Sequence, residues 1–330
     1  MTNRRITLAS RPEGFPRETD FALVEAPVPE PGPGEVLVRT RWLSLDPYMR
    51  GRMSTVRSYA SPVELGDVMT GQGVAEVVAS GSPLFAPGDL VVGQTGWQEY
   101  AVLGPGALRR VDPALQPPSL ALHAVGMTGL TAYFGLFDVC RPAPGDTVVV
   151  SAASGAVGQI VGQLAKLAGC RTVGIAGGPE KVADLAGYGY DVGIDYRGED
   201  VGAALGAACP GGVDVYFDNV GGAITDAVLQ RLALRARVAI CGQISQYNLS
   251  QPELTPRSFV PLIVSRARIE GFLVSDYSPR FDEALARLAA WVSEGRLRYR
   301  EDVTDGLENA PRAFIGMLRG ENRGKTLVRL

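Results

Sequence analysis

The sequence predicts an α/β protein with two domains, one built on a parallel sheet and one rich in short strands. From about Ala121 onward, short β-branched and aliphatic runs alternate with segments of helical periodicity. This is the pattern of a parallel sheet covered by helices on both faces. Before that point, the alternation from Val36 to Trp42 predicts a half-buried strand, and Pro-Gly pairs predict turns between short strands.

Six strands are predicted in the second part of the chain: 147–150, 172–175, 192–195, 213–218, 238–241 and 269–274. A long amphipathic helix follows at about 280–293, and the C-terminal tail reads as a short helix and a final strand. We expect the tail to return to the N-terminal domain. The predicted catalytic domain therefore comprises 1–120 and 297–330, and the predicted cofactor domain comprises 121–296.

The segment from Gly145 to Lys181 combines a strand, a glycine-rich turn and the start of a helix. The helical pattern begins near Gly158 and ends at Gly169, where a left-handed residue is expected. Main-chain N–H groups at such a helix start bind the pyrophosphate of a dinucleotide, and small residues allow close approach. The first glycine of the usual GxGxxG pattern is replaced by Ala153, so the turn alone is weak evidence.

The end of the strand predicted at 172–175 favours NADP(H) over NAD(H). An NAD site usually carries Asp or Glu about 20 residues past the glycine-rich turn, where it binds the ribose 2′-hydroxyl. Here that position holds Ala176-Gly177-Gly178, and Lys181 lies just beyond, within reach of a 2′-phosphate. Glu180 is adjacent, but a carboxylate in the first turn of a helix is favoured there for its own electrostatic reason. A solvated surface lysine is the alternative for Lys181.

Composition and charge argue against several other classes of protein. A net charge of −3 gives no basic field for nucleic acid or anionic membranes, and no run reaches transmembrane length. The chain has one histidine, His123, which we expect to be packed or at the surface rather than catalytic. With four scattered cysteines it cannot supply the ligands of a zinc site. The start of the chain lacks the apolar core of a secretory signal. The four cysteines are scattered without CxxC spacing, which favours buried thiols in a reducing compartment, so we expect a cytoplasmic protein.

Longer segments give the chain a resemblance to a known family. They are LSLDPYMRGRM (43–53), GMTGLTAY (126–133), AASGAVG (152–158), GGPEK (177–181), DVYFDNVGG (214–222), ICGQISQYN (240–248), EGFLVSDY (270–277) and GENRGKT (320–326). The chain resembles the zinc-free medium-chain dehydrogenases/reductases, and more narrowly the group of prostaglandin reductases, bacterial curcumin reductase and plant alkenal double-bond reductases. The resemblance implies a Rossmann cofactor domain, a GroES-like, partly open β-barrel domain, NADP(H) without zinc, and a homodimer.

The resemblance also implies reduction of a carbon–carbon double bond conjugated to a carbonyl group. Zinc-containing relatives carry a metal-binding cysteine in the loop that here reads LDPYMR, 45–50. Hydride addition to the β-carbon develops negative charge on the carbonyl oxygen, and without a metal hydrogen-bond donors must stabilise it. Tyr48 and Tyr247 are the candidate catalytic residues, and Tyr247 also follows the carboxyl end of the strand at 238–241. Packing is the alternative for both, and Arg50 and Arg52 are expected to be structural or solvated.

Other residues are expected to bind the cofactor because they match positions of the family. Asn and Thr also cap local backbone, which is the alternative for each taken singly. The expected residues are Thr128 and Asn219 near the nicotinamide; Gly155, Ala156, Val157, Gly158 and Gln159 in the phosphate turn; Gly177, Lys181 and Tyr196 near the 2′-phosphate; the lining segments Cys241, Gly242, Gln243, Ile244, Ser245 and Phe272, Leu273, Val274; and Asn322 in the tail.

These observations lead to one expected function and two alternatives. We expect an NADPH-dependent reductase of small α,β-unsaturated ketones and aldehydes, in which the β-carbon receives hydride and tyrosine hydroxyls stabilise the enolate. An NADPH:quinone oxidoreductase of the zeta-crystallin type shares the fold and the lack of zinc, although the segments 43–53 and 243–248 argue against it. A cofactor-binding sensor or structural protein without turnover is the alternative from another class.

Overall fold

The computed structural model describes residues 2–251 and 257–330, and they separate into two compact units. The first unit contains residues up to His123, residues 247–250 and residues from Glu301 onward; the second contains the rest. The predicted domain boundaries, at 120/121 and 296/297, lie a few residues away and leave out the short segment 247–250. They remain a prediction for the functional domains.

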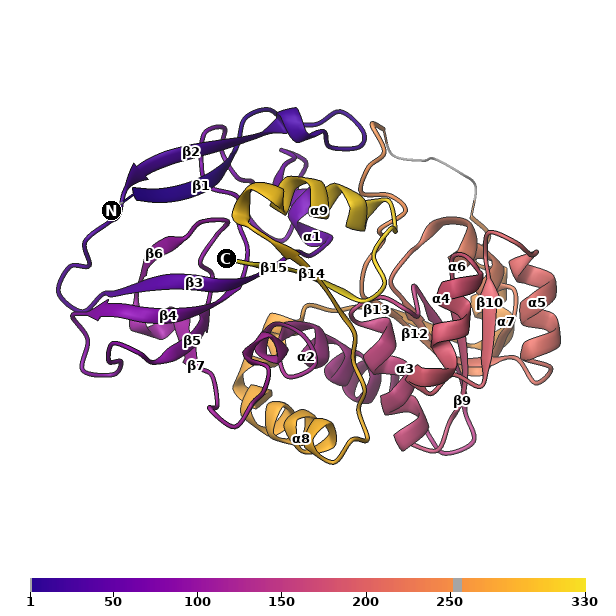
Figure 1. Cartoon of the computed structure of the whole chain (residues 1–330). Coiled ribbons are helices and arrows are strands. Elements are labelled where there is room, and N and C mark those ends of the chain that lie inside the picture. The colour runs from indigo at the N-terminus through magenta and orange to yellow at the C-terminus, as the bar shows by residue number, and fades with distance from the viewer. Residues whose placement is uncertain (1, 252–256) are drawn as a thin grey trace. The chain divides into compact units, whose positions relative to one another are not determined.

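The second unit is built on a six-stranded parallel sheet (Figure 1). Its order is β10-β9-β8-β11-β12-β13, so the first strand in the chain lies at the centre and the order reverses between β8 and β11. This is the order of a dinucleotide-binding Rossmann sheet, and the reversal marks the usual binding crevice. The strands are β8 (Thr147–Ser151), β9 (Arg171–Ala176), β10 (Val192–Asp195), β11 (Val213–Asp218), β12 (Leu232–Ile240) and β13 (Arg268–Gly271).

The six predicted strands all exist, with two differences in extent. β12 begins six residues before the predicted Val238, because the part of the strand before Val238 is mostly exposed or half-buried and carries two arginines, which hide the strand pattern. β13 ends at Gly271 instead of Val274, and a 3-10 helix takes over at Val274. β13 is an edge strand whose four residues are all exposed, so burial imposes no apolar pattern on it.

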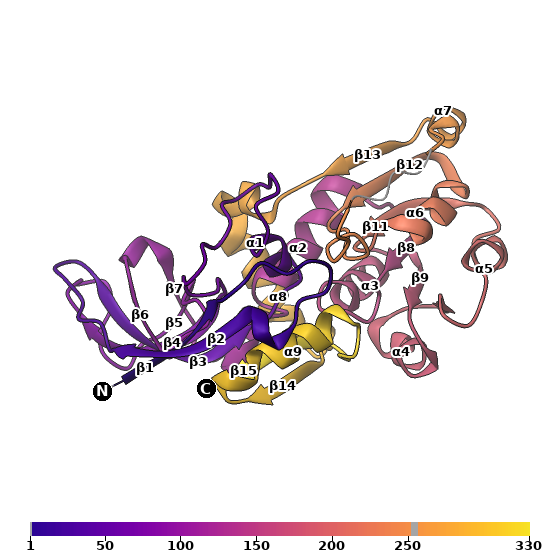
Figure 2. The ribbon, with the colours of Figure 1, turned by 90° about the horizontal axis from the view of Figure 1, so that it is seen from above.

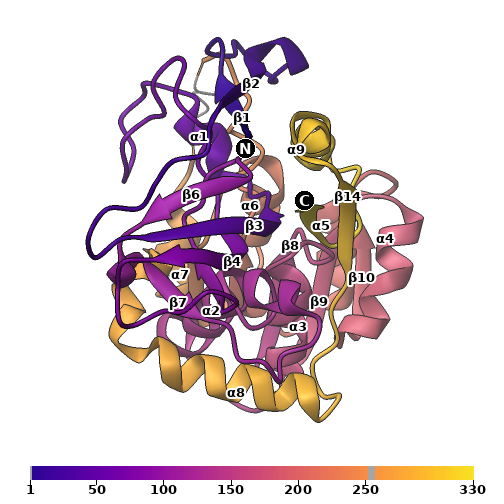
Figure 3. The same cartoon turned by 60° about the vertical axis from the view of Figure 1, so that its left-hand side comes forward.

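Helices pack on this sheet through apolar faces. α3 buries Ile160, Val161 and Leu164 and ends before Gly169, whose φ of +79° is the predicted left-handed conformation. Figure 3 shows α8 running beneath α2, and the predicted apolar positions Leu285 and Leu288 of α8 are buried. The helices of this unit are α2 (Met127–Phe134), α3 (Gly158–Leu167), α4 (Pro179–Asp184), α5 (Val201–Ala208), α6 (Gly222–Leu229), α7 (Val260–Ser265) and α8 (Phe281–Ser293).

The first unit contains a mostly antiparallel seven-stranded sheet of order β14-β15-β3-β4-β5-β7, with β6 paired to β3, and a separate β1–β2 hairpin. The last strand, β15, pairs with β3 from the N-terminal part of the chain. The strands are β1 (Thr2–Leu8), β2 (Phe21–Pro27), β3 (Val36–Ser44), β4 (Gly73–Ser80), β5 (Leu90–Gly93), β6 (Tyr100–Leu103), β7 (Leu108–Arg110), β14 (Glu301–Asp305) and β15 (Lys325–Arg329).

Aromatic packing attaches the C-terminal helix α9 (Ala310–Leu318) to the N-terminal strands. Phe314 of α9 meets Trp97 edge-on at 5.5 Å, and Trp97 stacks on Phe21 at 5.6 Å. Such aromatic pairs each add about 1 kcal/mol beyond area burial. The short helix α1 (Tyr48–Arg52) follows β3 and carries one of the predicted catalytic tyrosines. None of the described helices is long and apolar enough to cross a membrane.

Candidate active site

The phosphate turn lies between β8 and α3, as the sequence predicts. A Cβ added at Gly158 would lie 2.7 Å from the Cα of Ala153, so only glycine lets the first turn of α3 approach the end of β8. Ala152 adopts a left-handed conformation, with φ of +48°, and its carbonyl accepts the Gly155 N–H at 2.9 Å. The chain thus reverses tightly before α3, and the first main-chain N–H groups of the helix face the end of the turn.

Ala153, which replaces the first glycine of the fingerprint, is accommodated by a glycine on the neighbouring strand. Its methyl group is fully buried, and a Cβ added at Gly174 of β9 would lie 2.9 Å from it. The methyl group of Ala153 therefore occupies space that the fingerprint glycine would leave empty. Gly174, on the neighbouring strand, leaves room for this methyl group because it has no side chain. Sequence reasoning missed Gly174, because its relation to Ala153 depends on the register of β8 against β9.

Tyr190 supports the first turns of α3 from below. Its ring is buried and lies against Gly162, where an added Cβ would come within 2.5 Å of it. Its hydroxyl donates to the carbonyl of Gly158 at 2.7 Å, and burial raises the pKa of this phenol well above its ordinary value. This hydrogen bond ties the first turn of α3 to Tyr190, which lies just before β10. Sequence reasoning missed this residue as well.

The predicted 2′-phosphate corner brings Gly177 and Tyr196 together. A Cβ added at Gly177 would lie 2.7 Å from the Tyr196 ring, so the ring covers the glycine directly. No acidic residue ends β9, but Asp195 reaches this corner from β10 and accepts the Gly178 N–H at 2.7 Å. Main-chain N–H groups of Gly178 and Arg197 hold the pKa of Asp195 below its ordinary value. The Asp195 carboxylate is therefore occupied by hydrogen bonds from main-chain N–H groups. Lys181 lies in α4, which begins directly after Gly178.

Asn219, predicted near the nicotinamide, is held by the end of β8. Its side-chain amide donates to the Ser151 carbonyl at 2.8 Å, and its own N–H donates to the Ser151 hydroxyl at 2.9 Å. Asp218 is fully buried beside it and accepts five donors: the hydroxyls of Ser151, Tyr216 and Thr225 and the N–H groups of Val220 and Gly221. The switch point of the sheet is therefore organised by Ser151 and Asp218, neither of which was predicted.

The predicted lining segment 241–245 is hydrogen-bonded to the residues at the end of β11. The N–H groups of Cys241 and Gly242 donate to the Asp218 carbonyl at 2.8 and 3.1 Å, and Ile244 donates to Asn219 at 3.3 Å. Ser245 donates twice to Val220, from its N–H and its hydroxyl. The loops after β11 and β12 thus form one hydrogen-bonded body at the carboxyl edge of the sheet.

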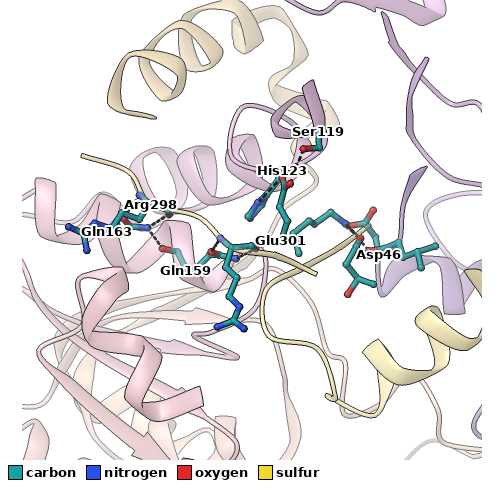
Figure 4. Close-up of polar contacts among 11 residues, drawn as sticks. Asp46, Ser119, His123, Gln159, Gln163, Arg298 and Glu301 are labelled. Carbon is teal, nitrogen blue, oxygen red and sulfur yellow. Dashed lines mark hydrogen bonds and ion pairs between the residues drawn. The ribbon is translucent and has the colours of Figure 1, made fainter. Parts of the chain in front are cut away.

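Several other predicted cofactor residues have local partners. The Gln159 side chain is fully buried and exchanges two hydrogen bonds with the main chain of Arg300, while Gln163 does the same with Arg298 (Figure 4). The Asn322 amide donates to Gly324 within its own loop at 2.7 Å. Phe272 packs edge-on against Phe217 at 6.3 Å, just before Leu273 and Val274. For these residues, a role at the cofactor would have to come from the main chain or from the rest of the side chain.

The remaining predicted residues lie at or beside helix starts. Thr128 is buried in the first turn of α2. Ala156 and Val157 complete the phosphate turn directly before α3. Gln243 lies beside Gly221, where an added Cβ would meet its side chain at 3.2 Å.

Tyr48 is the first residue of α1, in the first unit. Burial raises the pKa of its phenol well above the ordinary value of 10, and the nearby carboxylate of Asp46 raises it further. The side chain of Gln94 hydrogen-bonds to the phenol, and the Arg52 guanidinium lies 5.8 Å from the ring centre. Tyr48 therefore presents a neutral, protonated hydroxyl over the whole physiological pH range. Arg50 is structural, as expected: it is buried and donates to the carbonyls of Pro12 and Gly14.

A buried ion pair fixes the loop that precedes Tyr48. The Lys325 ammonium lies 2.9 Å from the Asp46 carboxylate and donates to the Leu45 carbonyl at 2.7 Å, and Asp46 also accepts the Ser44 hydroxyl (Figure 4). Lys325 is 1% exposed. It belongs to the GENRGKT segment, so the contribution of this segment to the loop comes from Lys325, whereas Asn322 stays within its own turn.

Tyr247 follows the loop after β12, but its segment, 247–250, belongs by its contacts to the first unit. The chain thus passes from the sheet of the second unit into the first unit immediately before this tyrosine. Tyr247 and Tyr48 are therefore members of the same compact unit. Asn248, next to Tyr247, is buried, and its carbonyl lies 3.7 Å from a Cβ added at Gly14.

In the described parts of the chain, no group of three or more His, Cys, Asp or Glu side chains could hold a metal ion. His123 is fully buried, with its Nδ1 3.8 Å from Glu301 (Figure 4). Glu301 also accepts the Ser119 hydroxyl at 2.8 Å. His123 is thus a packed residue of the first unit.

Comparison with known proteins gives the family. Residues 4–111 match the profile "N-terminal domain of oxidoreductase", and residues 156–290 match "Zinc-binding dehydrogenase". The NADPH-dependent curcumin reductase of Escherichia coli (strain K12) is 46% identical over 99% of this chain and 97% of its own length. The chain belongs to the medium-chain dehydrogenase/reductase family, in its zinc-free group.

Two further relatives of this family cover the chain equally well. The putative NADP-dependent oxidoreductase YfmJ of Bacillus subtilis (strain 168) is 49% identical over 100% of this chain and 98% of its own length. The crystal structure of CurA from Vibrio vulnificus in complex with NADPH superposes with a TM-score of 0.95 at 45% identity, covering 99% of this chain and 98% of that one. The predicted medium-chain reductase fold, with its Rossmann and β-rich domains, is confirmed by these matches.

Proposed function

We propose that this protein is an NADPH-dependent reductase of the carbon–carbon double bond of α,β-unsaturated ketones and aldehydes. One observation carries the proposal: the loop that holds a metal-binding cysteine in zinc-containing relatives here holds Tyr48, a phenol kept protonated by burial. A protonated phenol in this position replaces a Lewis acid as the group that meets negative charge on a carbonyl oxygen. The names of the relatives, curcumin reductase and NADP-dependent oxidoreductase, support the same chemistry.

The chain's residues fit NADPH as cofactor. The turn at 152–157 consists mostly of small residues, and α3 approaches β8 closely at Gly158, which suits a pyrophosphate. The corner after β9 has an open side at Gly178, where an added Cβ would meet nothing within 4 Å, and the Asp195 carboxylate at this corner is bonded to main-chain N–H groups. Gly155, Gly158 and Asn219 would hold the dinucleotide at the switch point, and Lys181 and Tyr196 would hold the 2′-phosphate.

The chain's own residues then perform three tasks. When bound, NADPH supplies the hydride that adds to the β-carbon of the substrate. The Tyr48 hydroxyl donates a hydrogen bond to the substrate carbonyl oxygen and strengthens it as negative charge develops there. Tyr247 supplies a second hydroxyl, for the same oxygen or for protonation of the α-carbon, with water as the other proton source. Ser151 and Asp218 keep the switch-point loops in place while this happens.

Two other functions are distinguished by one set of assays. The purified protein is given NADPH or NADH with 2-alkenals, enones and quinones, and cofactor oxidation is followed by absorbance. The proposal predicts oxidation of NADPH with enals and enones, and a strong preference over NADH. Oxidation with quinones alone would indicate a quinone oxidoreductase of the zeta-crystallin type. Tight NADPH binding without oxidation on any substrate would indicate a sensor or structural protein.

We further propose that the protein is a cytoplasmic homodimer acting on a small molecule. The exposed edge strand β13 (Figure 2), which includes the half-exposed apolar Ile269, offers main-chain groups to a second copy. The neighbouring helix α7 exposes Ile263 and Val264. The four cysteines are free thiols, which suits a reducing compartment. Light scattering after size-exclusion chromatography tests the dimer, and fractionation of the source cells tests the location.

A further inference from the structure

A cavity of about 400 Å³ in the second unit is lined by five arginines: Arg141, Arg235, Arg237, Arg266 and Arg268. The rest of its wall is Cys140 and Ala236, so no acidic or aromatic side chain among the described residues lines it. It is an open cleft at the surface, with a volume in the range of small-molecule sites. Nothing in the proposed reaction uses it.

The cavity lies at the end of the sheet opposite to the phosphate turn. Arg237 of β12 is level with Val215 and Arg268, and Val215 is level with Val148, near the beginning of β8. Because all six strands are parallel, the phosphate turn at the end of β8 belongs to the other edge. An anion bound among the arginines is therefore separate from the cofactor.

The charge in the cavity is only partly neutralised. Arg237 is paired with Asp146 and also donates to the carbonyls of Cys140 and Arg141. Arg268 donates to the Val139 carbonyl. These contacts with carbonyl groups leave the guanidinium charge in place. Five cations are therefore met by the paired carboxylate of Asp146 and by Glu270, whose charge acts on Cys140 in the wall.

Two of the arginines have no structural task that the described residues reveal. In the single chain, the side chains of Arg235 and Arg266 are exposed and make no hydrogen bond or ion pair with the described residues, and Arg266 lies between α7 and β13, the elements proposed above to meet a second copy. Both have left-handed backbones, with φ of +62° and +51°, and so does Arg141 at +50°. Left-handed residues often end helices, as Arg141 and Arg266 do here, but glycine fills such positions at lower conformational cost. Strained conformations at one cavity are typical of functional sites.

We propose that this cavity is a binding site for a small polyanion of the oligophosphate class, with Arg235 and Arg266 as its principal ligands. Guanidinium groups bind phosphate oxygens in pairs, and several of them around one cavity favour a ligand with several negative charges. The absence of aromatic side chains from the described wall gives a nucleobase nothing to stack on, so the phosphates themselves are recognised. The chain carries a net charge of −3, so the positive field is local, which favours a small anion over nucleic acid.

The test is calorimetric titration of the full-length protein with sodium pyrophosphate and with tripolyphosphate, in saturating NADPH so that the cofactor's own phosphate site is filled. We expect saturable binding by the wild type. The double variant Arg235→Gln/Arg266→Gln should bind at least about tenfold more weakly, because two charge-assisted contacts are lost. The control variant Arg287→Gln/Arg296→Gln removes the same charge from exposed ion pairs and should change the affinity less than about twofold.

Three results would overturn the proposal: no saturable binding at millimolar pyrophosphate or tripolyphosphate, binding that disappears when NADPH is saturating, or equal loss in the two double variants. If the Arg235→Gln/Arg266→Gln variant fails to fold, labelling of the wild type with phenylglyoxal decides. Pyrophosphate should then protect Arg235 and Arg266, but not Arg287, from modification. Equal labelling with and without pyrophosphate would exclude the site.

Discussion

The hydroxyl of Ser151, the last residue of β8, donates to the Asp218 carboxylate, at the end of β11, over 3.1 Å. The two strands are neighbours at the point where the strand order of the parallel sheet reverses. This is the crevice in which Rossmann sheets bind dinucleotides. Asp218 also receives the N–H groups of Val220 and Gly221, so one buried carboxylate sets the spacing of the loops on both sides of the crevice.

Ser151→Ala should both destabilise the protein and weaken cofactor binding. It removes the bond to Asp218 and leaves the Asn219 N–H without its acceptor. The expected loss in the free energy of unfolding is about 2 kcal/mol, measured by urea denaturation. The dissociation constant for NADPH, measured by fluorescence, should rise with it. Ser293→Ala, which removes an exposed hydroxyl bonded within its own helix, is the control and should cost less than about 0.5 kcal/mol. Equal effects of the two variants would refute the role of Ser151.

Ala153 and Gly174 should behave as a coupled pair. Gly174→Ala places two methyl groups about 3 Å apart in a packed core, and should destabilise the protein by about 2 kcal/mol. Ala153→Gly removes one of the two methyls, so the double variant should recover part of that loss. The recovery is partial because an added Cβ also meets Leu185 and Tyr190 at 3.0 Å. Unfolding free energies of the four proteins of this double-mutant cycle give the coupling, and strict additivity would contradict the proposed compensation.

What the sequence reveals depends on how far apart the cooperating residues lie. The phosphate turn could be predicted because Ala153, Gly155 and Gly158 are neighbours in the chain, and the strands of the buried sheet could be predicted from their apolar runs. Ser151 and Asp218 are separated by 67 residues, and Asp46 and Lys325 by 279. Their pairing depends on strand order and register, which composition and periodicity do not contain. The arginine cavity was missed for the same reason, since its side chains come from three separate parts of the chain.

The buried pair of Lys325 and Asp46 should be among the most costly polar contacts to break. Lys325→Met leaves an uncompensated carboxylate next to the Tyr48 loop, and the expected loss in unfolding free energy is about 3–5 kcal/mol. Glu76→Gln tests an ion pair with Arg41 whose side chains are 38% and 39% exposed, and should cost at most about 1 kcal/mol. Denaturation curves of both variants provide the comparison. A small effect of Lys325→Met would show that the loop does not depend on the pair.

Lys181→Ala should weaken NADPH selectively. Loss of one cation from a 2′-phosphate costs about 1.5–3 kcal/mol, so KM for NADPH should rise roughly tenfold or more, while KM for NADH should stay unchanged. Lys166→Ala, which removes a surface lysine paired with Asp191 at 2.8 Å, is the control and should affect neither cofactor. Steady-state kinetics with both cofactors decide. An equal rise for NADPH and NADH would remove the 2′-phosphate assignment of Lys181.

Tyr48→Phe tests the proposed chemistry itself. Removal of one donor to a developing oxyanion lowers kcat by about 100-fold or more, whereas affinity for NADPH should stay the same because Tyr48 is expected to act on the substrate alone.

The pH profile gives an independent check of the role of Tyr48. Since the pKa of the Tyr48 phenol is raised above the ordinary value of 10, the protonated form persists as pH rises, and wild-type kcat/KM should show no loss from this phenol up to pH 10. Tyr247→Phe is measured in parallel: a fall in kcat assigns it a second donor role, and an unchanged rate assigns it to packing. If Tyr48→Phe keeps full activity, the enolate must be stabilised by other groups, and the proposed role of the α1 loop is wrong.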